Sequence, residues 1–105
     1  MAKSLSPAQA TRKIRQCARA PNLDLFQTAH VKERMEERGL IMGDITHLLK
    51  FGDVLDEAKP STRPGFWKYT IFGKTPNSGS RQLGLTLIPD FNHKHIKLVT
   101  IFWKD

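Results

Sequence analysis

Apolar side chains recur at helical spacing in the first half of the chain. In three segments they are three and four residues apart, which is typical of helices that bury one side. A proline or a glycine follows each segment and stops the helix there. The predicted helices run from Pro7 to Pro21, from Gln27 or Thr28 to Gly39, and from near Asp44 to Gly52.

After residue 52 the apolar and polar residues alternate, which is the pattern of strands. Strands are predicted at residues 53–58, 66–72, 81–88 and 95–103. Because helices come first and strands follow, we expect an α+β domain. In this fold two or three N-terminal helices pack on one face of a four-stranded, mainly antiparallel sheet.

The last predicted strand has apolar residues on both faces. Simple alternation places Ile96, Leu98 and Phe102 on one face, and Val99, Ile101 and Trp103 on the other. A strand of this kind is typically covered on both sides. We therefore expect it to lie inside the sheet rather than at its edge.

Charge is divided unevenly along the chain, whose formal net charge is +7. Residues 1–20 carry five basic side chains and no acidic one, whereas residues 21–65 carry six basic and eight acidic ones. Residues 66–105 again have a basic excess, six against two. This distribution favours a polyanionic partner such as RNA.

The basic N-terminus also suggests a division of the chain. Residues 1–22 are expected to form a basic helical arm, and residues 23–105 the α+β domain. The side chains of the arm that we expect to contact RNA are Arg12, Lys13 and Arg15. The apolar stripe of this helix is thin, because it consists of Ala10, Ile14, Cys17 and Ala18.

The composition also excludes several kinds of protein. A single cysteine allows no internal disulfide and no cysteine-based zinc cluster, and it fits a reducing cytoplasm. No apolar stretch reaches the roughly 18 residues that a membrane span requires. We therefore expect a cytoplasmic protein with no membrane partner and no cofactor.

One segment of the second helix combines basic and acidic residues. At about 100° per residue, His30, Arg34 and Arg38 form one stripe beside the apolar residues of the helix, and most of the glutamates face the opposite side. Arginines four residues apart repel each other mildly. Either an ion pair of Arg34 with Glu37 or an anionic ligand would offset this repulsion.

Several sequence features follow one another in a characteristic order. They are H-x-x-x-R-M-x-x-R-G at 30–39, D-I-x-x-L-L-x-x-G at 44–52, Y-x-I-x-G at 69–73, Arg81, and L-V-T-I-F at 98–102. Together they resemble a small bacterial family of domains of unknown function, over about residues 28–103. That family is grouped with toxin-like ribonuclease domains of the RelE and BrnT type, in the barnase, EndoU, colicin and RelE fold class.

The resemblance implies a metal-independent endoribonuclease whose concave sheet face binds RNA, with a cognate antitoxin protein as a further partner. The residues that it places around the scissile phosphate are His30, Arg34, Arg38, Arg81 and Thr100. RNA supplies the nucleophile in its 2′-hydroxyl, so the protein must supply a base, an acid and fixed cations. Histidine can transfer the proton, and arginine fits the phosphate.

Other polar residues of the strands are candidates for RNA contacts. His93 and His95 form an H-x-H pair that could hold a metal from one face of a strand. Only Asp90 lies nearby as a further ligand, so we expect a polar loop or an RNA contact instead. Lys68 is expected to face solvent or RNA, because strand neighbours alternate and Tyr69 fits the core.

Two other classes of function are consistent with the sequence. The second and third helices, joined by residues 39–43, could form a helix-turn-helix that binds DNA. Against this, the third helix offers only His47 and Lys50 as long polar side chains. A protein-interaction module, with its basic arm on an acidic partner, is the other alternative.

Overall fold

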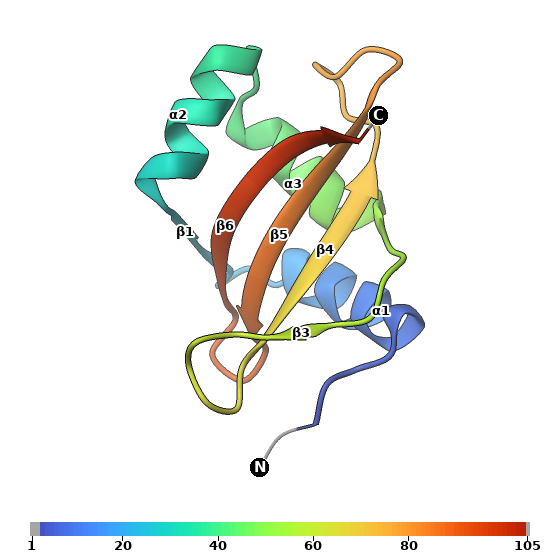
Figure 1. The fold of residues 1–105 in the computed structure, drawn as a ribbon, viewed down its shortest axis with the longest axis vertical. Helices are drawn as coiled ribbons and strands as arrows, with labels where there is room; N and C mark the ends of the chain where they lie inside the picture. Colours follow the sequence, from blue (N-terminus) through green and yellow to red (C-terminus); the bar gives the residue numbers. More distant parts are fainter. Residues whose placement is uncertain (1–2, 105) are drawn as a thin grey trace.

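A computed structural model describes residues 3–104 of the chain and shows an α+β fold (Figure 1). Three helices accompany a six-stranded mixed sheet. The elements are α1 (Pro7–Ala18), β1 (Asp24–Gln27), α2 (Ala29–Arg38), α3 (Met42–Phe51), β2 (Asp53–Val54), β3 (Lys59–Pro60), β4 (Trp67–Gly73), β5 (Gln82–Asp90) and β6 (His95–Lys104). Residues 1–2 and 105, at the outer ends of the predicted arm and domain, lie outside this description.

The helices begin and end where local chemistry directs them. Ser6 caps α1 in a capping box with Gln9. The Thr28 hydroxyl caps α2 by accepting a hydrogen bond from the Val31 amide. Gly39 ends α2 in the left-handed conformation, at φ 65°. The three predicted helices are therefore confirmed.

The sheet is larger than predicted, with the strand order β1-β6-β5-β4-β2 and with β3 paired to β4. Only β1 runs parallel to its neighbour β6, and the other pairs are antiparallel. The prediction of four strands was wrong because β1 and β3 are too short to show a pattern. They form by pairing with distant segments.

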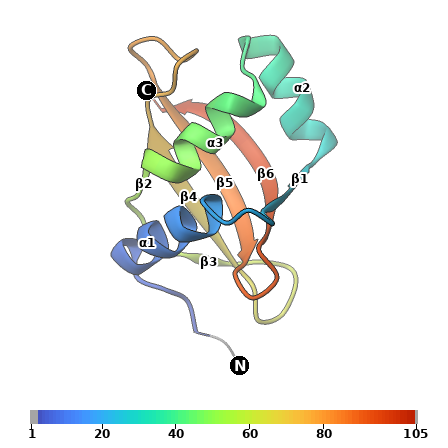
Figure 2. The ribbon, with the colours of Figure 1, turned by 180° about the vertical axis from the view of Figure 1, so that it is seen from behind.

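The helices occupy two positions around the sheet. Figure 2 shows α1 and α3 across one face of it, whereas α2 lies beside the edge formed by β1 and β6. The prediction that all helices pack on one face is therefore corrected. Because β1 leads directly into α2, the position of β1 in the sheet fixes α2 at this edge.

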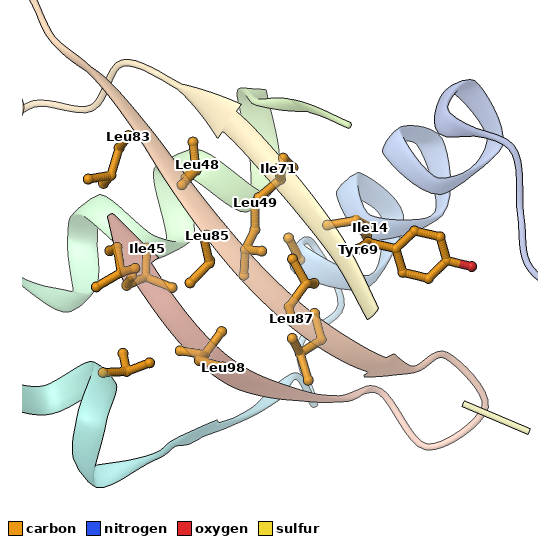
Figure 3. Close-up of a cluster of buried hydrophobic side chains, with 14 of the residues drawn as sticks. Ile14, Ile45, Leu48, Leu49, Tyr69, Ile71, Leu83, Leu85, Leu87 and Leu98 are labelled. Atoms are coloured by element: carbon orange, nitrogen blue, oxygen red, sulfur yellow. The ribbon is translucent and has the colours of Figure 1, made fainter. Parts of the chain in front are cut away.

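The core lies between the sheet and the helices, and Figure 3 shows its central side chains. The stripe predicted for α1 is confirmed, because Ala10, Ile14, Cys17 and Ala18 are all buried. The basic N-terminal helix thus shares one core with the rest of the fold. No helix among residues 3–104 is long and apolar enough to cross a membrane.

A β-bulge in β6 changes which residues share a face. Thr86 of β5 pairs with Thr100, but Leu87 pairs with Leu98, so Val99 is the extra residue. As a result Leu98 and Ile101 both point into the core, and Phe102 points to the other side of the sheet. The face predicted for Phe102 was wrong because simple alternation cannot include a bulge.

We call the side of the sheet away from α1 and α3 the open face, and it is turned toward the viewer in Figure 1. Its side chains follow from the strand register. They belong to Lys68, Thr70 and Phe72 of β4, Thr86 and Ile88 of β5, and Lys97, Thr100 and Phe102 of β6.

Candidate functional site

A hollow of about 310 Å³ lies on the open face, and we call it the open-face hollow. Its lining combines hydroxyl, cationic and carboxylate side chains. These residues are Asp56, Glu57, Lys59, Lys68, Thr70, Thr86, Val99 and Thr100. The structure therefore brings together two of the predicted site residues, Lys68 and Thr100.

Three threonines form a row across the strands at the floor of this hollow. Thr70 lies opposite Thr86, and Thr86 lies opposite Thr100. The hydroxyl oxygens of Thr70 and Thr86 are 3.1 Å apart and share a hydrogen bond. Each hydroxyl can both donate and accept, so the row can bind phosphate or sugar oxygens.

Two lysines carry the positive charge of the hollow. Lys59 of β3 lies directly opposite Lys68 of β4. Like charges at opposed strand positions are destabilising. Asp56 and Glu57 in the same hollow reduce this repulsion, and a bound anion would reduce it further.

An exposed aromatic side chain extends the open face at its β1 edge. Phe26 is 52% exposed and pairs in register with Lys97 of β6. Nearer the C-terminus of β6, the Phe102 ring covers Gly84 so closely that a β-carbon there would lie 2.5 Å from it. Aromatic and cationic groups at neighbouring positions suit single-stranded nucleic acid.

The predicted basic stripe of α2 lies outside the open-face hollow. Arg34 forms the internal ion pair with Glu37, at 3.1 Å. His30 is exposed on the first turn of α2. Arg38 is half-buried, and its guanidinium nitrogen Nη1 has no hydrogen-bond partner among residues 3–104. These three residues therefore flank the sheet edge.

Arg81 also lies apart from the open-face hollow, just before β5. Its guanidinium stacks on the Trp103 ring, 4.3 Å from the ring centre. Trp103 pairs with Leu83 and so belongs to the helix-covered face. Arg81 and Thr100 thus lie on different faces of the sheet.

Each histidine of the H-x-H pair has its own carboxylate partner. His93 Nδ1 is 2.9 Å from Asp90, and His95 Nδ1 is 2.9 Å from Asp24. Burial opposes ionisation of Asp90, but hydrogen bonds from His93 outweigh it and lower the pKa of Asp90. Among residues 3–104 no cluster of three or more histidine, cysteine or acidic side chains could hold a metal ion.

The basic residues of α1 have different environments. Arg15 donates hydrogen bonds to the carbonyl oxygens of Phe51 and Gly52 and to Asp53, so it caps the end of α3. Arg12 and Lys13 are exposed. The two exposed side chains are available to a partner, whereas Arg15 ties α1 to α3.

Sequence analysis missed most of the hollow. Thr86 alternates correctly in its strand, but no local feature distinguishes it from an ordinary surface threonine. Asp56, Glu57 and Lys59 belong to a segment predicted as strand and connecting loop. Only the pairing of β3 with β4 brings this segment to the threonine row.

Comparison with known proteins identifies a family for this chain. The family model of DUF4258, a domain of unknown function, matches residues 27–103, close to the range predicted from the sequence features. No curated protein and no solved structure matches the chain. Since the match spans most of the sequence, from the end of β1 to the end of β6, the chain belongs to the DUF4258 family.

Proposed function

We propose that the protein binds single-stranded RNA across the open face of its sheet. The observation that supports this most directly is the threonine row, which lies in one hollow with Lys59 and Lys68. Lysines offset phosphate charge, and hydroxyls position the backbone. Phe26, exposed beside Lys97, offers a ring on which a base can stack.

Cleavage of the bound RNA is a second candidate, as the resemblance to toxin-like ribonucleases implies. It is favoured by the carboxylates of Asp56 and Glu57, which share the hollow with both lysines. A carboxylate can accept the proton of the 2′-hydroxyl as its oxygen bonds to phosphorus and the bond from phosphorus to the 5′-oxygen breaks. A lysine ammonium can give a proton to the departing 5′-oxygen, and the lysines can stabilise charge on the phosphate. His30 and Arg81 lie away from this hollow, so the chemistry proposed here depends on the carboxylates.

A helix-turn-helix function has less support from the geometry. The third helix buries Ile45, Leu48 and Leu49 completely in the core. A recognition helix reads bases through the side that it exposes to the major groove. The long polar side chains that α3 offers there are His47 and Lys50, and both are half-buried. The role of a toxin with a cognate antitoxin partner stays a prediction from the resemblance.

Binding and cleavage can be tested in one experiment on the full chain. Fluorescently labelled single-stranded RNA is incubated with the protein in EDTA, and both retention and fragment length are measured. Lys68→Ala and Thr100→Val should weaken binding about five- to ten-fold each, because each removes a contact worth roughly 1 kcal/mol. Lys32→Ala, on the solvent side of α2, is the matched control.

Catalysis is tested with Glu57→Gln and Asp56→Asn, which keep the shape of each side chain. Loss of cleavage with retained binding in either variant would assign the base. His30→Ala and Arg81→Ala should cleave as the wild type does. Equal binding by the wild type, Lys68→Ala and Thr100→Val would refute the open-face interface, and preference for duplex DNA would favour the helix-turn-helix alternative.

A further inference from the structure

A second hollow, of about 400 Å³, lies at the end of the molecule near the N-terminal segment, and we call it the aromatic hollow. Its size falls within the roughly 300–1,000 Å³ typical of ligand pockets. Aromatic rings and two lysines dominate its lining. They are Phe66, Trp67, Tyr69, Phe91, Lys3 and Lys13.

The aromatic hollow and the open-face hollow lie on opposite sides of β4. Successive strand residues point to opposite faces. Lys68 and Thr70 accordingly line the open-face hollow, while Trp67 and Tyr69 line the aromatic one. Within the described part of the chain the two hollows have no lining residue in common, so each can be altered separately.

The rings of the aromatic hollow are held in place by neighbouring contacts. The Tyr69 hydroxyl accepts a hydrogen bond of 2.9 Å from the Leu5 amide, and Figure 3 shows this hydroxyl pointing out of the core. The Arg63 guanidinium lies 4.2 Å from the centre of the Phe66 ring. Tyr69 itself is buried, so the rings that can stack on a planar ligand are those of Phe66, Trp67 and Phe91, which are half-buried.

Positive charge gathers around the rim of the aromatic hollow. Lys13 lines the aromatic hollow and also two smaller hollows next to it. Arg12 lines one of these smaller hollows, and Lys94 lines the other. Among residues 3–104, the acidic residue in the lining of the aromatic hollow is Asp90, which accepts a hydrogen bond from His93. Electrostatics at this rim therefore favour an anion next to the rings.

We infer that the aromatic hollow binds a nucleotide, with the base among the rings and the phosphate at Lys13. Stacking on aromatic side chains tolerates any base, and a lysine at the rim adds the charge contact. The ligand is either a free mononucleotide or one unit of a single strand, since the chemistry is the same. This inference does not depend on the open-face interface.

Trp67 provides a direct signal for this binding. The chain has two tryptophans, so Trp103→Phe leaves Trp67 as the only one. The fluorescence of this variant is titrated with adenosine and uridine 5′-monophosphates, the nucleosides, inorganic phosphate and tetrauridylate. The nucleotides should quench it with an apparent Kd below about 1 mM, and the nucleosides and phosphate should bind about ten-fold more weakly.

Lys13→Gln tests the phosphate contact. Because Lys13 is exposed, its replacement should leave thermal unfolding unchanged while weakening nucleotide binding about five-fold and leaving nucleoside binding unaltered. Lys32→Gln is the matched control, and Lys68→Ala should keep the Trp67 response even though it alters the open-face hollow.

The outcomes separate the ligand sources and can overturn the inference. Equal affinity for monophosphate and tetrauridylate identifies a free nucleotide, whereas tighter binding of tetrauridylate identifies a unit of a strand. Unchanged Trp67 fluorescence with both ligands at about 10 mM would overturn the inference. Identical nucleotide binding by Lys13→Gln and Lys32→Gln would do the same.

Discussion

Asp44, on the first turn of α3, is completely buried. Its carboxylate accepts hydrogen bonds from the Ile41 amide and from the backbone and side-chain amides of Asn77. Burial opposes ionisation, but the hydrogen bonds from Ile41 and Asn77 outweigh it and lower the pKa of Asp44. One side chain thus caps α3 and fastens the loop between β4 and β5.

Replacing this carboxylate should destabilise the fold. In Asp44→Asn one carboxylate oxygen becomes an NH₂ group, which cannot accept a hydrogen bond. Whichever oxygen is replaced, at least one N–H donor of Ile41 or Asn77 then loses its acceptor. We expect the free energy of unfolding to fall by roughly 2–3 kcal/mol. Chemical denaturation at pH 7 measures this, with Glu33→Gln, on the exposed side of α2, as the control.

The lowered pKa of Asp44 also predicts how the stability of wild type and of Asp44→Asn depends on pH. The pKa of Asp44 is lower in the folded protein than in the unfolded chain, where it is about 3.9. Its contribution is complete above that value and is lost as pH falls through the folded pKa. The stability difference between wild type and Asp44→Asn should therefore shrink below about pH 4, and a constant difference down to pH 2 would contradict this account.

Single residues were predicted best where the reason was local. On α2, Val31 and Met35 beside the basic stripe are buried as helical spacing requires. Of the two partners that the sequence left open for Arg34, the structure shows the ion pair with Glu37. Asp44 was recognised only as an acidic residue at a helix start. Its link to Asn77 spans 33 positions, which no local pattern can reveal.

At the scale of elements, α1 is joined to the fold by both apolar and polar contacts. Ile14 is fully buried, and Arg15 reaches the end of α3 and the start of β2. Another guanidinium nitrogen of Arg15, Nε, is buried and finds no hydrogen-bond partner in the described part of the chain. The predicted role of Arg15 in RNA binding therefore competes with its role at the α1–α3 junction.

Arg15→Met distinguishes these roles. It removes the cation that caps α3 but keeps much of the side chain's length, so we expect a loss of roughly 1–2 kcal/mol in unfolding free energy. RNA affinity should change little. Arg12→Met, on the exposed side of the same helix, should change stability by less than about 0.5 kcal/mol. A stable Arg15→Met protein with weakened RNA binding would reverse the assignment.

The bulge in β6 places Thr100 in the candidate site. Val99 accepts a hydrogen bond from the Thr28 hydroxyl at the start of α2, 3.4 Å away. It also lets Thr100 complete the threonine row while Leu98 and Ile101 remain in the core. Alternation along the sequence predicted the strand correctly but placed Phe102 on the wrong face.

At the scale of the whole molecule, the basic charge does not form one patch. Lys59, Lys68 and Lys97 belong to the open face, and Lys13 and Lys94 lie around the aromatic hollow. The net charge of +7 predicted a polyanionic partner, but it did not predict that the basic side chains form two separate surfaces. Their separation arises because β4 divides the hollows.

Salt dependence tests whether phosphate contacts dominate binding to the open face. Each lysine that neutralises a phosphate releases counterions, so the logarithm of RNA affinity should fall linearly with the logarithm of salt concentration. Lys68→Ala should reduce the magnitude of this slope by about 1, whereas Lys32→Ala should leave it unchanged. Identical slopes for wild type and Lys68→Ala would show that Lys68 contacts no phosphate.

The sequence by itself determined the α+β class, the three helices to within a few residues at their ends, and the apolar stripes that α1 and α2 bury. These features depend on periodicity and on caps within a few residues, so they are readable locally. Only the tertiary structure decided the parallel pairing of β1, the bulge at Val99, and the meeting of Lys59 with Lys68 and the threonine row. Each of these depends on contacts between distant segments, whose free energy is set by packing and hydrogen bonding in the folded chain rather than by neighbouring residues.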